Sequence, residues 1–163
     1  MVNDNLYRND NLYRNDDLYL SAAIAQAKKS LREGGIPIGA ALAIDETLVS
    51  VGHNRRVQQN DPILHAETDC IRNAGRLTPA EYRRATMYTT LSPCPMCSGT
   101  ILLFGIPRVV IGENVNFIGS EELLADRGVE IIQAKNAEIE KILSEFIRDH
   151  KNLWFEDIGE LDG

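Results

Sequence analysis

The segments H-A-E, at residues 65–67, and P-C-P-M-C, at residues 93–97, together carry one imidazole, two thiols and one carboxylate. Histidine and cysteine side chains are common zinc ligands, and three of them leave the fourth position of a tetrahedral ion open. An open position is typical of a catalytic zinc site, because water can bind there and lose a proton near neutral pH. We therefore expect His65, Cys94 and Cys97 to bind a catalytic zinc ion.

The surrounding sequence predicts that both segments open helices, with Pro62 and Pro93 fixing the backbone just before them. The ligands then lie in the first helical turn, where free N–H groups and the positive end of the helix dipole favour thiolates. The two cysteines are three positions apart and share one face of their helix. Glu67 stands two positions after His65 and reaches the site from another side. We interpret Glu67 as the proton shuttle, which accepts a proton from water and later protonates the leaving group.

Two alternative interpretations of these residues stay open at this point. The C-x-x-C spacing alone also fits a redox dithiol, although the upstream histidine and glutamate favour a metal site. A structural zinc site normally has a fourth protein ligand, and His53 and Cys70 are the candidates for it. We expect Cys70 instead to be a small core residue, since a free cysteine is usually buried and inert.

Length and composition narrow the class of protein. A chain of 163 residues with 44% hydrophobic and 25% charged residues suits one globular domain. The formal charge of −7 argues against a protein that mainly binds a nucleic-acid backbone, which requires a surplus of lysine and arginine. No apolar run approaches the length of a membrane span, no signal peptide is recognisable, and three cysteines do not suggest a disulfide framework. These features predict a cytoplasmic protein with neither a membrane nor a nucleic-acid partner.

A hexad repeat occupies residues 3–20, with N-D-N-L-Y-R present twice and N-D-D-L-Y-L as the third copy. A period of six matches neither a helix nor a strand, and three short copies are too few for a solenoid. We expect residues 1–15 to be a flexible extension and residues 16–163 to form the folded domain. The alternative is that the leucines and tyrosines of the repeat dock on the surface of the domain.

Periodicity and turn residues predict an alternating pattern of helices and strands after the repeat. The predicted helices are 16–33, 65–74, 94–104, 120–127 and 134–150, and the predicted strands are 38–44, 48–52, 86–90, 108–112 and 129–133. An antiparallel hairpin followed by alternating strands and helices predicts a single three-layer α/β/α domain. Its mixed central sheet would have about five strands, with helices on both faces.

Five stretches of the chain resemble the yeast-type (fungal) cytosine deaminases, within the cytidine and deoxycytidylate deaminase-like superfamily of zinc deaminases. They are residues 34–39, 52–54, 88–97, 112–117 and 154–160. The resemblance extends over about residues 17–160 and implies a cytidine deaminase-like fold, one catalytic zinc per chain and a homodimer. It also implies that free cytosine is converted to uracil and ammonia in pyrimidine salvage. In that reaction a zinc-bound hydroxide attacks the amine-bearing carbon while Glu67 moves protons.

The resemblance further implies which residues contact a small heterocyclic substrate. Asn54 would hydrogen-bond the ring edge, Asp157 would hold the exocyclic amine or a ring N–H, and backbone N–H groups such as that of Ala66 would contact the ring. The apolar slot around the flat ring would be formed by Phe117, Trp154 and Ile38, and Ser92 is counted among the substrate-binding residues.

One residue inside the motif departs from the yeast pattern, because Ala66 stands where the yeast proteins have glycine, and H-A-E is common in tRNA adenosine deaminases. Related small rings therefore remain alternative substrates: 5-substituted cytosines, isocytosine-like rings, guanine or creatinine. A nucleic-acid adenosine deaminase acting on a flipped base is a more distant alternative. The alternative without catalysis is a binding module that zinc merely stabilises.

Overall fold

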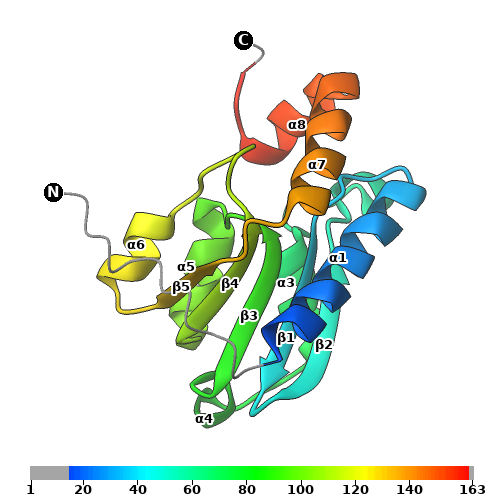
Figure 1. Ribbon diagram of the computed structural model, residues 1–163. Coiled ribbons are helices and arrows are strands. Elements are labelled where there is room, and N and C mark those ends of the chain that lie inside the picture. Colours follow the sequence, from blue (N-terminus) through cyan, green and yellow to red (C-terminus); the bar gives the residue numbers. More distant parts are fainter. Residues whose placement is uncertain (1–14, 162–163) are drawn as a thin grey trace, which may run out of the picture.

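A computed structural model describes residues 15–161, which form a five-stranded sheet flanked by helices (Figure 1). The strands are β1 (Gly39–Ile44), β2 (Thr47–His53), β3 (Ala85–Leu91), β4 (Arg108–Glu113) and β5 (Glu130–Gln133). The helices are α1 (Asp16–Arg32), α2 (Arg56–Gln59), α3 (Ala66–Ala74), α4 (Pro79–Tyr82), α5 (Pro95–Phe104), α6 (Glu121–Asp126), α7 (Ala137–Asp149) and α8 (Lys151–Ile158). None of these helices is both long and apolar enough to cross a membrane.

Strand β3 is the junction between the two halves of the sheet, whose spatial order is β2-β1-β3-β4-β5. Strand β1 pairs antiparallel with both β2 and β3, whereas β4 runs parallel to both β3 and β5. The carboxyl ends of β3 and β4 therefore meet at one edge of the sheet, and the loops that follow them are neighbours. In open α/β sheets this edge is the usual place of a ligand site.

Helices cover both faces of the sheet, which confirms the predicted three-layer architecture. On one face α1 packs on alternate residues of β1, Ala41 and Ala43, together with Tyr88 of β3. On the opposite face the other residues of β1, such as Leu42, belong to a larger core with α3, α5, α6 and α8. Every residue of β1, β3 and β4 is buried, as expected for strands covered on both sides.

Helix α3 lies very close to strand β2, and a glycine makes this approach feasible. A Cβ atom added at Gly52 would lie 2.3 Å from the backbone nitrogen of Cys70, which is shorter than any van der Waals contact. The close packing fixes α3 on the sheet and thereby places the side chains at its N-terminus.

The third copy of the hexad repeat is part of the folded structure. The carboxylate of Asp16 accepts hydrogen bonds from both terminal nitrogens of Arg108, at 2.8 and 2.7 Å, and from the hydroxyl of Tyr88 at 2.7 Å. Tyr19 packs its ring against Tyr88, with centroids 5.4 Å apart, and donates a hydrogen bond to the backbone oxygen of Glu46. The first two copies lie outside the described residues.

All five predicted strands are present, while one predicted helix begins later and three further helices form. Helix α7 begins at Ala137 rather than at residue 134, because Lys135 has a φ of 51° and Asn136 caps the helix by accepting from the N–H of Ile139. Helices α2, α4 and α8 lie outside the five predicted helices. Elements this short depend on tertiary packing more than on propensity.

Candidate metal centre and active site

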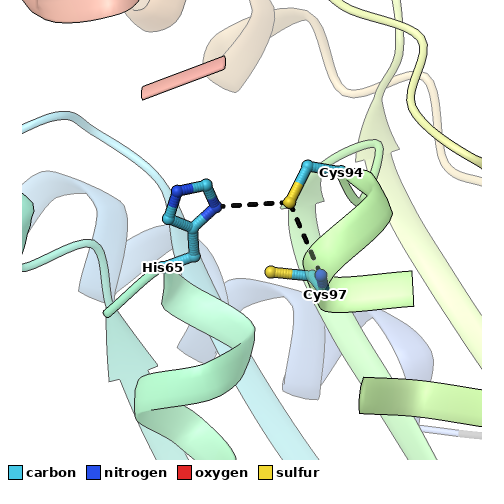
Figure 2. Close-up of side chains that lie close together, drawn as sticks. All are labelled: His65, Cys94 and Cys97. Atoms are coloured by element: carbon cyan, nitrogen blue, oxygen red, sulfur yellow. Dashed lines mark hydrogen bonds between the residues drawn. The ribbon is translucent and has the colours of Figure 1, made fainter. Parts of the chain in front are cut away.

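Three side chains from the starts of α3 and α5 converge, as Figure 2 shows for His65, Cys94 and Cys97. His65 and Cys94 are the N-cap residues of their helices, and Cys97 lies in the first turn of α5. Their ligand atoms all lie within 4.8 Å of one another, and His65 Nδ1 is 3.4 Å from Cys94 Sγ. The sequence prediction that these three residues come together is therefore correct.

The donor set fits zinc. Donor atoms around a tetrahedral zinc lie roughly 3.5 Å apart, so small side-chain movements would close the observed cluster around an ion. A hydrogen bond from the Cys97 side chain and the contact with His65 lower the pKa of Cys94 to about 4, against the effect of burial. The same hydrogen bond, together with burial, holds the pKa of Cys97 well above its usual value. A metal ion would replace the remaining proton, because zinc binds thiolates.

A carboxylate stands on the far side of the His65 ring. Asp157 Oδ1 lies 3.3 Å from His65 Nε2, while Nδ1 faces Cys94. Burial lowers the pKa of His65, but hydrogen bonds with Asp157 and Cys94 outweigh it and raise the pKa to about 10. A carboxylate on the second ring nitrogen is the usual partner of a zinc-bound histidine, since it fixes the tautomer that leaves the first nitrogen free for the metal.

Neither candidate for a fourth protein ligand is near the cluster. The ring nitrogens of His53 lie 3.1 Å from Gln26 Oε1 and 2.8 Å from Glu33 Oε2. Cys70 is fully buried beside Ser50, and burial raises the pKa of its thiol to about 12. Cys70 is thus the core residue that the sequence predicted. Within residues 15–161 the donor group has three members, which leaves one position of a tetrahedral ion open.

Glu67 is nearly inaccessible, with 3% of its surface exposed, and belongs to the same site. Burial is the main cause that raises its pKa, and the negative charge at Cys94 raises it further. The hydroxyl of Thr89, on β3, donates a hydrogen bond of 2.9 Å to Glu67 Oε1. A buried carboxyl group with a raised pKa suits general acid–base catalysis. Thr89 was not identified from the sequence.

Asn54 and Asp157 form a buried polar pair beside His65, although 103 positions separate them in the chain. Asn54 Nδ2 donates to Asp157 Oδ1 at 2.9 Å, and the N–H of Arg56 donates to Asn54 Oδ1 at 3.0 Å. Because Oδ1 is held by a backbone donor, the amide directs its NH₂ group at Asp157. The second N–H of that group remains available for a hydrogen bond to another acceptor.

The apolar residues named from the sequence also gather here. Ile38, Ala66 and Trp154 are buried members of one core cluster, and Phe117 packs against it. The rings of Phe117 and Trp154 meet edge to face, with centroids 6.1 Å apart and planes at 84°. The backbone N–H of Asn54 donates to the carbonyl oxygen of Ile38, which connects the apolar residues to the polar pair.

The environment of Ser92 differs from the sequence expectation. Its hydroxyl donates to Glu121 Oε1 at 2.7 Å and accepts from the N–H of Gly119 at 2.9 Å. The residue is 2% exposed, and its side chain is already committed to these two partners. Any contact between Ser92 and a substrate would therefore come from its backbone.

Three soft donors with an open position, beside a buried carboxyl group at the carboxyl edge of a mixed sheet, define a zinc-dependent hydrolytic enzyme. Comparison with known proteins agrees. The family described as the cytidine and deoxycytidylate deaminase zinc-binding region matches residues 13–113. The chain is 50% identical over 142 residues to a cytosine deaminase of Candida albicans, which corresponds to 86% of this chain and 95% of that protein.

More distant relatives are similar over smaller parts or in fold alone. A tRNA-specific adenosine deaminase of Streptococcus pyogenes serotype M18 is 37% identical over 107 residues, 64% of this chain and 67% of that protein. The structure of Acinetobacter baumannii RibD matches with a TM-score of 0.65 at 22% identity, over 88% of this chain and 40% of that one. The chain belongs to the cytidine and deoxycytidylate deaminase family of zinc-dependent enzymes, which hydrolyse C–N bonds.

Proposed function

We propose that this protein hydrolyses free cytosine to uracil and ammonia. The observation that carries the proposal is that Asp157 contacts both Asn54 and His65, so that Asn54 and Asp157 would offer a donor and an acceptor to a small polar ring beside the metal donors. Identity of 50% to the Candida albicans cytosine deaminase, over nearly the whole length of both chains, supports cytosine over the related rings.

The residues of the site suit the separate tasks of this reaction. Zinc bound by the three donors supplies Lewis-acid activation of water. Glu67 accepts the proton of the attacking water and passes protons to the ring nitrogen and the leaving amine, which its raised pKa favours. Asn54 donates to the ring carbonyl oxygen, and Asp157 accepts from the amine or a ring N–H. Phe117 and Trp154 hold the flat ring in orientation.

The carboxyl terminus of the chain contributes to closing this site. Trp154 and Asp157 both lie on α8, and both side chains are buried against residues from distant segments. We expect release of the product to require outward movement of α8, since two of its side chains cover the ring.

Ammonia release from a panel of substrates tests the proposal. The panel is cytosine, 5-fluorocytosine, 5-methylcytosine, cytidine, creatinine, guanine and adenine. We expect cytosine and its small 5-substituted forms to be turned over, and cytidine to be excluded because a ribose does not fit a closed slot. Turnover of creatinine or guanine alone would redirect the proposal, and no turnover of any free ring would refute it. Deamination of tRNA with a steep salt dependence would support a nucleic-acid deaminase instead.

We also propose a cytoplasmic homodimer in which residues 16–163 form the deaminase domain and residues 1–15 an extension that catalysis does not need. Two large apolar side chains on the loop after β4, Val115 and Ile118, are 71% and 68% exposed, and Leu103 of α5 is 78% exposed. Apolar residues exposed to this extent suit a surface that a second copy covers. Light scattering should give a mass twice that of the 18.2 kDa chain, and a monomer at micromolar concentration would contradict the dimer.

A further inference from the structure

Residues 114–119 form a loop that carries Phe117, and this pocket-wall loop packs directly on the segment that precedes Cys94. The N–H of Ser120 donates to the carbonyl oxygen of Pro93 at 3.0 Å. A Cβ atom added at Gly119 would lie 1.9 Å from the same oxygen, so only glycine permits the contact. The loop that carries Phe117 is therefore packed against Pro93, the residue next to the metal donor Cys94.

A buried carboxylate holds the two segments together. Glu121, at the start of α6, is 6% exposed and accepts the hydroxyl hydrogen of Ser92 at 2.7 Å. Its other oxygen, Oε2, accepts from the Gln133 side chain at 3.0 Å. The amide of Asn114, in the pocket-wall loop, donates to Oε1 at 3.3 Å and to Oε2 at 3.5 Å. Since Ser92 in turn accepts from the N–H of Gly119, a continuous chain of hydrogen bonds runs from the wall loop through Ser92 to Glu121.

Glu121 is the buried acidic residue of α6, whereas Glu122 and Asp126 of the same helix are exposed. The buried hydroxyl of Ser92 and the buried side-chain amide of Gln133 both donate to this carboxylate and would lose their acceptor if it were removed, and such a loss costs about 1–3 kcal/mol for each group. Loss of this acceptor affects the pocket-wall loop in two ways. Ser92 binds the N–H of Gly119 in the loop, and Asn114, which belongs to the loop, donates directly to Glu121.

We propose that Glu121, acting through Ser92, is a positioning residue that sets the place of Phe117 relative to Cys94 and so determines how tightly the ring of the substrate is held. The proposal rests on the proposed function for the identity of the substrate. Phe117 contacts the substrate and its transition state alike, so a displaced wall weakens both and raises KM with little change in kcat. A purely structural role for Glu121 would instead lower the thermal stability and leave KM of the folded enzyme unchanged.

Glu121→Met removes the acceptor at similar length, and Glu121→Gln is the conservative variant. The glutamine keeps one oxygen for Ser92, and its NH₂ group can donate to Gln133 Oε1, which is buried without a partner. Glu122→Met, at the exposed neighbouring position in the same helix, is the matched control. In zinc-loaded enzyme at 25 °C we expect Glu121→Met to raise KM for cytosine about tenfold and Glu121→Gln to raise it less than about threefold, with kcat changed by less than about threefold in both.

The second readout does not depend on the substrate. Trp154 is the one tryptophan of the chain, and it packs on Phe117, so its fluorescence reports the position of the wall. Glu121→Met should increase quenching by acrylamide, while Glu121→Gln and Glu122→Met should match the wild type. If Glu121→Met does not fold, Ser92→Ala removes the same hydrogen-bond chain and should shift both readouts in the same direction.

The proposal would be overturned if folded, zinc-loaded Glu121→Met had the quenching and the KM of the wild type. It would also be overturned if Glu121→Gln were as impaired as Glu121→Met. Absence of cytosine turnover by the wild type would refute the proposed function, whereas the fluorescence comparison would still decide the role of Glu121.

Discussion

The metal-binding half of the site and its substrate-recognition half are assembled from different kinds of segment. The metal donors and Glu67 come from two short segments at the starts of α3 and α5, and each segment spans about one helical turn. The proposed substrate contacts come from the end of β2, the loop after β4, and α8. The first half thus requires two helix starts to meet, whereas the second requires three distant segments to pack around them. Variants that affect one half and spare the other test how separate they are.

The largest effect on turnover is expected for Glu67→Gln. Glu67 belongs to the metal-binding half of the site, but it is not one of the three metal donors. Loss of the proton-transferring carboxyl should lower kcat about a thousandfold while the zinc content per chain stays at the wild-type level. Ammonia release and metal analysis of the same sample measure both quantities. Glu122→Gln, on the exposed surface, is the control, and substantial turnover by Glu67→Gln would remove Glu67 from the mechanism.

Asp157→Asn tests the contact at which the two halves meet. Asp157 contacts both His65 and Asn54, so its change should lower kcat/KM about a hundredfold and speed the loss of zinc during dialysis about tenfold. Metal retention and kinetics are compared with the wild type. Unchanged zinc retention would show that the substrate half does not support the metal half.

Thr89→Val should have a smaller effect that is confined to the metal half. The substitution keeps the shape of the side chain but removes the hydroxyl that donates to Glu67, so kcat should fall about tenfold with KM and zinc content unchanged. Steady-state kinetics on cytosine measure this split. A rise of KM alone would place Thr89 with the substrate contacts and contradict the division between the halves.

The smallest effect is expected for removal of residues 2–14, which should leave kcat and KM within about twofold of the wild type. A longer deletion, through Leu20, is the contrasting variant. It removes Asp16 and leaves Arg108 buried without its principal partner, so the melting temperature should fall by several degrees or more. A large loss of turnover in the shorter deletion would show that the extension takes part in catalysis.

The two halves also differ in how far the sequence predicts them. The three donors and Glu67 could be found because each of the two segments carries its groups within one helical turn, and the pair of segments matches the motif of zinc deaminases. The sheet was predictable because its strands are short segments rich in apolar and β-branched residues, with turn residues between them. Thr89 gave no signal, since a threonine in a buried strand is ordinary and only the fold places its hydroxyl beside Glu67.

The partners of Ser92 and the existence of α8 lie beyond the sequence for the same physical reason. The sequence shows that Ser92 is near Cys94, but the partner that occupies its hydroxyl is 29 positions away. Helix α8 is too short to be stable by propensity, and burial of Trp154 and Asp157 stabilises it in the fold. Groups that depend on contacts between distant segments cannot be assigned from a local pattern.

The anchored third hexad has a consequence for the repeat as a whole. All three copies carry aspartate and tyrosine at the positions of Asp16 and Tyr19, so these two anchors alone do not determine which copy docks on the sheet. The sixth residue does: Leu20 is 5% exposed in the core, whereas Arg8 and Arg14 occupy its position in the earlier copies. A slip of α1 by one hexad would bury an unpaired guanidinium group, which is strongly unfavourable. Within the repeat, Leu20 is therefore the residue that determines which copy packs on the sheet.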